Sequence, residues 1–432
     1  MKSNKEKKHY RSRKKINNEN NNILNKINEF NNNGKRTIAI FCDAWYPAVD
    51  GVIKTFENHA RILAKDNNVL VCVPKHKNKT YETNRDFLVI GTNSLNVSKS
   101  VGYDCGVPAF DEFFTKVMKV AKIDIIHIHS PFFMGSYAIN IAKKKKIPVI
   151  GTFHTSYKDE FYRNTKSSLI SQILTNIIVK VFSKTNLILT MNNYAANTLR
   201  EYGYKGEIKL LSNATDFNLT DDISLEVENL RKEYKISDDE VVFSYIGRIV
   251  KEKQLFFLLD VFQVLKQKGI KFRMFYIGQG LDFNKLKKKI DEYKLNNETV
   301  LTGVVTDTTK KAALLNMSDL FLFPSNYDTD GIVKIEAACV KVPSLCIKDT
   351  GAASTITDNI NGFLSELDVE KYANRIIEII SDKENLKKVG EQAYKDLYIT
   401  WEEVVEKLSN IYDEEIEKHK IKLEKKKKRT RK

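Results

Sequence analysis

The chain lacks any apolar run close to the roughly 18–20 residues that a membrane-spanning helix needs, although 42% of its 432 residues are hydrophobic. It also lacks the apolar core of a secretory signal peptide, because residues 1–15 are polar and basic. The five cysteines stand in mostly apolar surroundings without the spacings of metal ligands, which favours reduced core residues. These absences predict a cytoplasmic protein, and the length predicts two domains.

Positive charge is abundant and gathers at both ends of the chain. The net charge is +16, residues 1–35 are rich in Lys, Arg and Asn, and residues 421–432 hold eight basic residues against one acid. Such compositions predict two disordered tails. Attraction to anionic lipid is one interpretation of them, worth about 1 kcal/mol per basic residue near such a surface. Nucleic-acid binding and simple solubility are the alternatives.

Short apolar runs alternate with helical patterns over most of the chain. One series lies within residues 36–216 and a second within residues 217–398. Strands that alternate with helices form parallel sheets with helices on both faces. The sequence therefore predicts an α/β fold of two Rossmann-like, doubly wound domains with a ligand cleft between them. A last helical pattern at residues 399–420 precedes the basic tail.

Two carboxylates stand eight residues apart around a glycine, directly after the apolar run 320–323. The segment from Asp328 to Glu336 reads Asp-Thr-Asp-Gly-Ile-Val-Lys-Ile-Glu, and good helix formers follow it. It predicts a loop with one acid and a helix with the second. Because a helix N-terminus presents free N–H groups and partial positive charge, it suits a phosphate, and the acids suit the hydroxyls of a sugar nucleotide. Charges that merely offset the helix dipole are the alternative.

Two cations follow another apolar run, residues 241–246. Arg248 and Lys253 are five residues apart, and fixed cations at a strand end can stabilise a departing pyrophosphate without a metal. A solvated surface pair is the alternative. Glycines end the next two predicted strands, at Gly278 and Gly303.

In this order the motifs resemble the retaining glycosyltransferases of family 4, which have the GT-B fold, over residues 37–415. The resemblance implies transfer of a hexose from a nucleotide diphosphate sugar, with UDP-glucose as the expected donor and neither cofactor nor metal. It implies that Arg248 and Lys253 grip the diphosphate, that Asp328 contacts the donor sugar and that Glu336 binds the ribose. The family usually has Glu where this chain has the shorter Asp328.

The resemblance implies further site residues in both domains. His154 matches a strand-end histidine that contacts the donor sugar. Asp50 matches a glycine loop that approaches the phosphates and the acceptor, and His129 matches a segment that faces the cleft. The other implied donor-binding positions are Gly51, Gly247, Gly278, Gly303, Val304, Gly331, Ile332 and Val333. Buried, hydrogen-bonded histidines are the alternative for His127 and His129.

Residues 43–51 and 153–157 most resemble bacterial envelope enzymes, including diacylglycerol glucosyltransferases. The expected acceptor is therefore a membrane glycerolipid, and the expected partners are the donor and an anionic membrane surface, without nucleic acid. The protein is then expected at the inner face of the cell membrane. A soluble glycan, polysaccharide or protein acceptor is the second hypothesis, and a non-catalytic protein that binds nucleotide sugars or nucleic acid is the third.

One apolar stripe, within residues 169–182, repeats at helical spacing and has lysines around it. The pattern favours a helix packed in the core, and a helix that lies on a membrane is the alternative.

Overall fold

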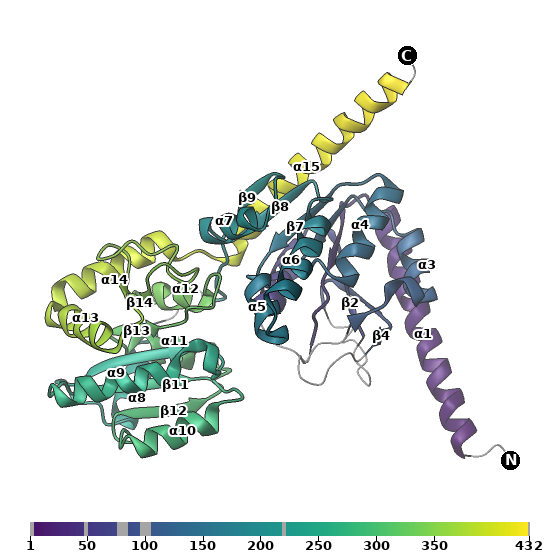
Figure 1. The fold of residues 1–432 in the computed structure, drawn as a ribbon. Helices are drawn as coiled ribbons and strands as arrows, with labels where there is room; N and C mark the ends of the chain where they lie inside the picture. Colours follow the sequence, from purple (N-terminus) through teal and green to yellow (C-terminus); the bar gives the residue numbers. More distant parts are fainter. Residues whose placement is uncertain (1–3, 47–50, 76–84, 96–104, 218–221, 431–432) are drawn as a thin grey trace. The chain divides into compact units, whose positions relative to one another are not determined.

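The computed structural model describes residues 4–46, 51–75, 85–95, 105–217 and 222–430 (Figure 1). The chain divides into two compact units. Unit 1 comprises Met1–Met191, Ala196–Leu211 and Val405–Lys432, and unit 2 comprises Asn192–Ala195 and Ser212–Val404. The cleft expected between the two domains stays a prediction.

Unit 1 is built on a seven-stranded parallel sheet in the order β3-β2-β1-β6-β7-β8-β9. Most of its strands are buried along their whole length, because helices cover a parallel sheet on both faces. The strands are β1 (Thr37–Phe41), β2 (Asn68–Pro74), β3 (Leu88–Thr92), β6 (Ile125–Ile128), β7 (Val149–Phe153), β8 (Leu187–Thr190) and β9 (Ile208–Leu210). A two-stranded antiparallel sheet follows β3 in the sequence. It consists of β4 (Ser94–Leu95) and β5 (Cys105–Gly106).

The strands of unit 1 alternate with helices, as the apolar runs predict. The helices are α1 (Asn4–Asn32), α2 (Gly51–Leu63), η1 (Pro108–Phe110), α3 (Glu112–Val120), α4 (Phe133–Lys145), α5 (Tyr157–Thr165), α6 (Ser168–Phe182), α7 (Asn193–Glu201) and α15 (Trp401–Thr430). The first residues of α7 and α15 belong to unit 2, and their remainder belongs to unit 1.

Unit 2 has a six-stranded parallel sheet in the order β12-β11-β10-β13-β14-β15. Its strands are β10 (Val241–Ile246), β11 (Phe272–Ile277), β12 (Thr299–Gly303), β13 (Leu320–Phe323), β14 (Ser344–Ile347) and β15 (Phe363–Ser365). Its helices are α8 (Ser224–Glu233), η2 (Lys251–Lys253), α9 (Leu255–Gln267), α10 (Phe283–Glu292), α11 (Thr308–Asn316), α12 (Ile332–Cys339), α13 (Val369–Ser381) and α14 (Lys383–Leu397).

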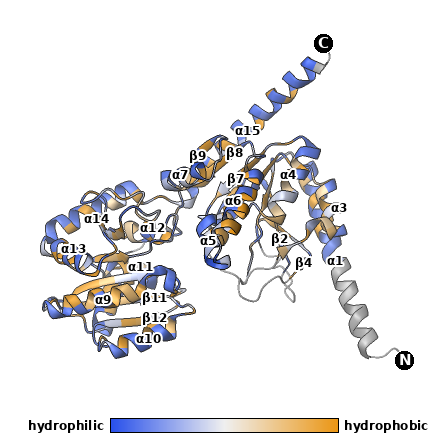
Figure 2. Cartoon of the chain, in the orientation of Figure 1, coloured by the Kyte–Doolittle hydropathy of each residue, from blue (hydrophilic) through white to orange (hydrophobic). Residues whose placement is uncertain are grey.

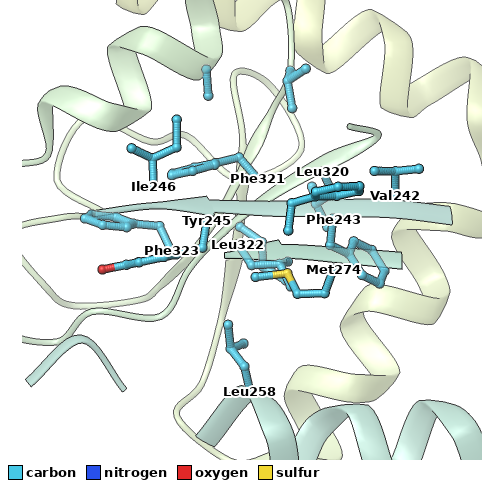
Figure 3. Close-up of a cluster of buried hydrophobic side chains, with 14 of the residues drawn as sticks. Val242, Phe243, Tyr245, Ile246, Leu258, Met274, Leu320, Phe321, Leu322 and Phe323 are labelled. Atoms are coloured by element: carbon cyan, nitrogen blue, oxygen red, sulfur yellow. The ribbon is translucent and has the colours of Figure 1, made fainter. Parts of the chain in front are cut away.

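The core of unit 2 lies on both faces of this sheet. Figure 3 shows apolar side chains of β10, β11 and β13 that project to the two sides, with Leu258 of α9 facing one of them. Phe243 stacks on Phe262 of α9 with ring centroids 6.2 Å apart, and it also contacts Phe272. Strands β10 and β13 are paired in the middle of this core. Their position matters because the candidate site residues follow these two strands.

The prediction of a disordered tail over residues 1–35 is wrong for the described part. Helix α1 packs on α3, with Ile27 1% and Phe30 8% exposed, and the Asn31 side chain bonds Val120 and Lys122. A short apolar stripe at the end of a polar segment is therefore enough to dock it. The basic end of the chain is likewise helical, because α15 continues to Thr430.

The expectation that the stripe on α6 is core is wrong for half of it. Ile178, Val181 and Phe182 are buried. Four other members of the stripe are exposed: Leu169, Ile170, Ile173 and Ile177.

Candidate functional site

Strand order points to one edge of each sheet. In unit 2, the chain runs outward from β10 to β11 and β12, and then returns to place β13 on the other side of β10. Parallel α/β sheets bind ligands at such a switch point, outside the carboxyl ends of the strands. Arg248 follows β10 at this point and Asp328 follows β13, so the fold brings predicted site residues to the expected edge.

Lys253 and Asp328 are in direct contact. The Lys253 Nζ atom donates to both carboxylate oxygens of Asp328 at 2.6 Å, and the two side chains are only 13% and 22% exposed. A partly buried pair of this kind is screened less by salt than a surface pair. Because an ammonium group has three N–H donors, an N–H of Lys253 remains for an anionic ligand.

Arg248, which follows β10, is exposed. Its carbonyl oxygen accepts a hydrogen bond from the Tyr245 hydroxyl at 3.1 Å. Burial, and after it the Asp328 carboxylate, raises the pKa of Tyr245 well above its usual value, so this hydroxyl keeps its proton as a donor. The backbone of Arg248 is thus fixed while its guanidinium faces solvent, where it is available to a phosphate.

The glycines after β10 and β11 allow two loops to touch. A Cβ on Gly278 would lie 2.0 Å from the Gly247 carbonyl oxygen, and Gly278 has φ +147°. Gly247 N–H donates to Ile277 O, and Ile249 N–H donates to Gln279 O, both at 3.0 Å. Gly278 therefore serves close backbone packing, which holds the loop that carries Arg248.

Gly303 and Val304 follow β12, at the edge of the same sheet. Gly303 has φ +72°, and Val304 is 66% exposed. The register between β11 and β12 shifts at this point. The strand end therefore presents an exposed apolar side chain. Contact of this segment with the base of the donor stays a prediction.

The loop before α12 is held from several sides within unit 2. The Asn192 amide donates to Thr329 O at 2.8 Å, and the Asn213 amide donates to the Asp330 carboxylate at 2.7 Å. A Cβ on Gly351 would lie 2.5 Å from Asp328 O. Rigid support of this kind is what a binding loop needs to keep a functional side chain in place.

Gly331 is the residue before α12, so Ile332 and Val333 form its first turn. A Cβ on Gly331 would lie 2.7 Å from the Phe323 ring, which explains glycine at this position without any need for unusual backbone angles. Lys334 in the same turn is 1% exposed, and its ammonium group donates to Ala352 O and, at 3.1 Å, to the Thr355 hydroxyl. The sequence does show a lysine inside an apolar helix, but not these partners.

Glu336 is also buried and paired. It is 2% exposed, and Lys311 of α11 donates to its Oε1 at 3.3 Å. Lys311 was not predicted as a site residue, because it is 25 positions away on another helix. Each of the two predicted acids therefore has its own lysine: Lys253 for Asp328 and Lys311 for Glu336.

Unit 1 contains a cluster of four histidines, defined as His59, His127, His129 and His154. Nδ1 of His129 lies 2.9 Å from Nε2 of His154. The ring nitrogens of His127 lie 2.8 Å from the Tyr412 hydroxyl and 2.7 Å from the Thr152 hydroxyl. The predicted pair of His129 and His154 is thus in contact, and His59 is a member that sequence reasoning missed.

Burial disfavours the charged form of three of these histidines. It lowers the pKa of His127 and His129 well below the usual value, and it lowers the pKa of His59 to about 3. Nitrogens of His59, His127 and His129 lie within 4.8 Å of one another, as a metal site requires. Both nitrogens of His127 already have hydroxyl partners, however, so the arrangement fits a hydrogen-bonded cluster, and the absence of a metal stays a prediction.

Asp43 marks the corresponding switch point of unit 1, between β1 and β6. Its carboxylate accepts from the Ser130 hydroxyl at 2.5 Å and from Met134 N–H at 2.9 Å. Burial raises its pKa to about 6. Of the predicted residues nearby, Asp50 lies outside the described residues, and Gly51 begins α2 and is exposed.

Two family models match consecutive parts of this chain. A family model described as Glycosyltransferase Family 4 matches residues 49–219, and one described as Glycosyl transferases group 1 matches residues 226–396. The alpha-monoglucosyldiacylglycerol synthase of Acholeplasma laidlawii is 26% identical over 373 residues, which cover 82% of this chain and 91% of the relative. The enzyme of the same name from Streptococcus pneumoniae is 24% identical, over 76% of this chain and 74% of the relative.

Among solved structures, Anabaena HepE in complex with UDP has a TM-score of 0.72 at 17% identity, and the match covers 88% of this chain and all of that one. This likeness shows the fold, which is the predicted GT-B fold. The two family models together span most of the chain. The chain belongs to the glycosyltransferases, with a family 4 domain followed by a group 1 domain.

Proposed function

We propose that this glycosyltransferase moves a glucosyl residue from UDP-glucose to a hydroxyl group of a membrane glycerolipid such as diacylglycerol, with retention of the anomeric configuration and without a metal or cofactor. The observation that carries the donor part is the contact between Lys253 and Asp328 at the switch point of unit 2. The lipid acceptor is supported by the names of the two synthases to which the chain is similar.

The donor's diphosphate suits the cationic side of this site. Arg248 and the remaining N–H of Lys253 can bind phosphate oxygens, and the first turn of α12 adds backbone N–H groups. Glu336 is placed one helical turn further on and suits the ribose hydroxyls. Asp328 suits hydroxyls of the sugar, because carboxylates accept hydrogen bonds in pairs.

The reaction then needs no covalent intermediate on the protein. The acceptor oxygen attacks the anomeric carbon from the side of the leaving group, while the bond from that carbon to the diphosphate oxygen breaks. The departing diphosphate takes the acceptor proton, and Arg248 and Lys253 stabilise the charge that develops on it. For His154 we keep the role that the family resemblance gives, contact with the donor sugar, and its hydrogen bond with His129 supports a fixed ring.

The test is a matrix of nucleotide sugars against acceptors, read by mass spectrometry. UDP-glucose with a diacylglycerol dispersion is expected to give a monoglucosyl lipid, and proton couplings of the product should show the α-anomer. Arg248→Ala, with Lys287→Ala as an exposed control on α10, separates this site from contaminating activity. A β-linked product, or transfer only to soluble glycans or proteins, would reject the retaining lipid enzyme in favour of the second hypothesis.

A non-catalytic nucleotide-sugar or nucleic-acid binding protein remains the contrast to any enzyme. Donor turnover above background in the same matrix would exclude it. Binding of UDP-glucose without turnover against every acceptor would support it.

A further inference from the structure

From Leu169 to Ile177, helix α6 of unit 1 exposes large aliphatic side chains and buries small polar ones. Its buried face carries Ser171 and Thr175, which are 1% and 0% exposed, followed by the apolar residues Ile178, Val181 and Phe182. Its solvent face carries four large aliphatic residues: Leu169 at 72%, Ile170 at 45%, Ile173 at 50% and Ile177 at 53%. We call these four the α6 patch. Figure 2 shows α6 as one of the most hydrophobic helices of the chain, although it lies at the surface of its unit.

The buried hydroxyls show that this orientation is specified. Ser171 donates to Lys158 O of α5 at 2.5 Å, and Thr175 donates to the Ser171 carbonyl within the helix at 2.8 Å. Buried polar groups that find such partners are satisfied, and a rotated helix would lose the bond to α5. Towards its end the helix also inserts Phe182 into the core. The α6 patch is therefore held outward by contacts on the opposite face.

Positive charge lies at both ends of the patch. Lys166 precedes α6, Lys180 lies on it seven residues after Ile173, and Lys184 lies just after its end; all three lysines are exposed. Residues 168–182 contain no acidic side chain. An aliphatic strip with a lysine rim has the composition of a helix that lies in the surface of an anionic bilayer.

The basic end of helix α15 begins near the C-terminal end of α6. The Asn186 amide, two residues after Lys184, lies 3.4 Å from Nδ1 of His419 on α15, and the backbone of Lys146 is also within hydrogen-bonding reach of His419. Beyond His419, α15 projects away from the rest of unit 1 (Figure 1) and carries most of the basic residues near the end of the chain. These residues are Lys420, Lys422, Lys425, Lys426, Lys427, Lys428 and Arg429.

We propose that the α6 patch inserts into the interfacial layer of an anionic lipid bilayer, with Lys166, Lys180 and Lys184 at the head groups. This inference deepens the proposed function, since it names the surface that would bring the enzyme to a lipid acceptor. A second copy of the chain fits the patch less well, because a symmetric contact would set the lysine rim of one copy against that of the other. No helix among the described residues is long and apolar enough to cross a bilayer.

The experiment is vesicle flotation of the full chain with phosphatidylcholine vesicles that contain or lack phosphatidylglycerol. The test variant is Ile173→Ser with Ile177→Ser, and the matched control is Leu225→Ser with Leu281→Ser, two exposed leucines of unit 2 at 69% and 93%. Wild type and control should bind the anionic vesicles, and the test variant should bind at least about tenfold more weakly because two aliphatic side chains no longer enter the lipid. Binding of the test variant equal to wild type would overturn the proposal.

Transfer and oligomeric state separate the remaining outcomes. The test variant should keep its transfer rate with a short-chain diacylglycerol dispersed in solution and its thermal unfolding temperature, which would show that donor chemistry and fold are intact. Wild type that transfers in solution but ignores both kinds of vesicle would overturn this inference and leave the proposed function standing. Vesicle binding without transfer to any acceptor would support this inference and overturn the proposed function. Light scattering that shows a wild-type dimer and a monomeric test variant, with neither binding vesicles, would assign the α6 patch to a second copy.

Discussion

Nδ1 of His129 lies 2.9 Å from Nε2 of His154, and the two rings stack at 23° with their centroids 5.1 Å apart. In such a contact one nitrogen carries the proton and the other accepts it, so the tautomer of one ring fixes that of the other. His129 is thereby a positioning residue for His154, the histidine that family resemblance assigns to the donor sugar.

Replacing His129 should therefore lower turnover through the orientation of His154. We expect His129→Phe to reduce kcat by up to about 10²-fold, as misplaced catalytic groups do, while His129→Gln, which keeps a hydrogen-bonding group, recovers part of the loss. Steady-state kinetics with UDP-glucose would measure both, with thermal unfolding as the control. Equal losses for Phe and Gln would mean that the imidazole contact does not position His154.

Removing a cation from the switch point of unit 2 should cost catalysis more than stability. Arg248→Ala should lower kcat by about 10²–10³-fold, the usual loss when one stabilising group for developing charge is removed. Its exposed side chain makes a large change in unfolding temperature unexpected. Lys287→Ala on α10 is the matched control, and near-normal transfer by Arg248→Ala would reject the donor site.

The length of the acid at position 328 should set the preference for donor sugars. Asp328→Glu keeps the charge that pairs with Lys253 but moves the carboxylate by one methylene. We expect the ratio of kcat/KM between UDP-glucose and other UDP-hexoses to change, while the binding of UDP alone, measured by calorimetry, stays within about threefold of wild type because the diphosphate contacts remain. An unchanged ratio would remove Asp328 from sugar recognition.

The close approach of two loops makes Gly278 a stability test for the site. Gly278→Ala should destabilise unit 2 by about 2–4 kcal/mol, because its Cβ would meet the Gly247 carbonyl oxygen at 2.0 Å. Gly269→Ala is the control, since Gly269 also has a positive φ of +75° but no atom within 4 Å of a Cβ; it should cost only about 1 kcal/mol. Denaturant unfolding would measure both, and equal effects would leave the backbone angle as the whole cause.

Acid should weaken unit 1 through the histidine cluster. Because burial lowers the folded pKa of His59 from 6.5 to about 3, the unfolded chain binds a proton between these values and the folded chain does not. Stability from this residue is therefore present above about pH 6.5 and falls on acidification, by about 1.4 kcal/mol per pH unit. His59→Phe should reduce the fall in unfolding free energy between pH 6 and pH 4, and identical pH profiles would contradict this assignment.

The sequence predicts the strands well because fully buried strands must be apolar along their length. The runs at 37–41, 241–246 and 320–323 coincide with β1, β10 and β13. Arg248, Lys253 and Asp328 are predictable for a related reason, since polar residues directly after such runs fall at the carboxyl edge of a parallel sheet.

Partners across the fold are not predictable in this way. Lys311 reaches Glu336 from another helix, and Asn192 supports the loop at Thr329 from 137 residues away, so no local pattern marks them. Helix α6 shows a second limit of prediction from sequence. Periodicity identifies a hydrophobic face, but it does not show whether that face packs on the protein or faces solvent. In α6 the buried hydroxyls of Ser171 and Thr175 fix the orientation of the helix.

The composition of unit 1 has a consequence for protein synthesis. Its histidine cluster is closed by Tyr412 on α15, which lies 285 residues after His127, and Arg36 beside β1 bonds Ser409 on the same helix. A ribosome therefore completes all of unit 2 before it releases the last helix of unit 1. Domains tend to fold as they emerge from the ribosome, first the N-terminal one, but here the first unit to be translated is the last to be finished, and it must wait with an incomplete core that a chaperone can recognise.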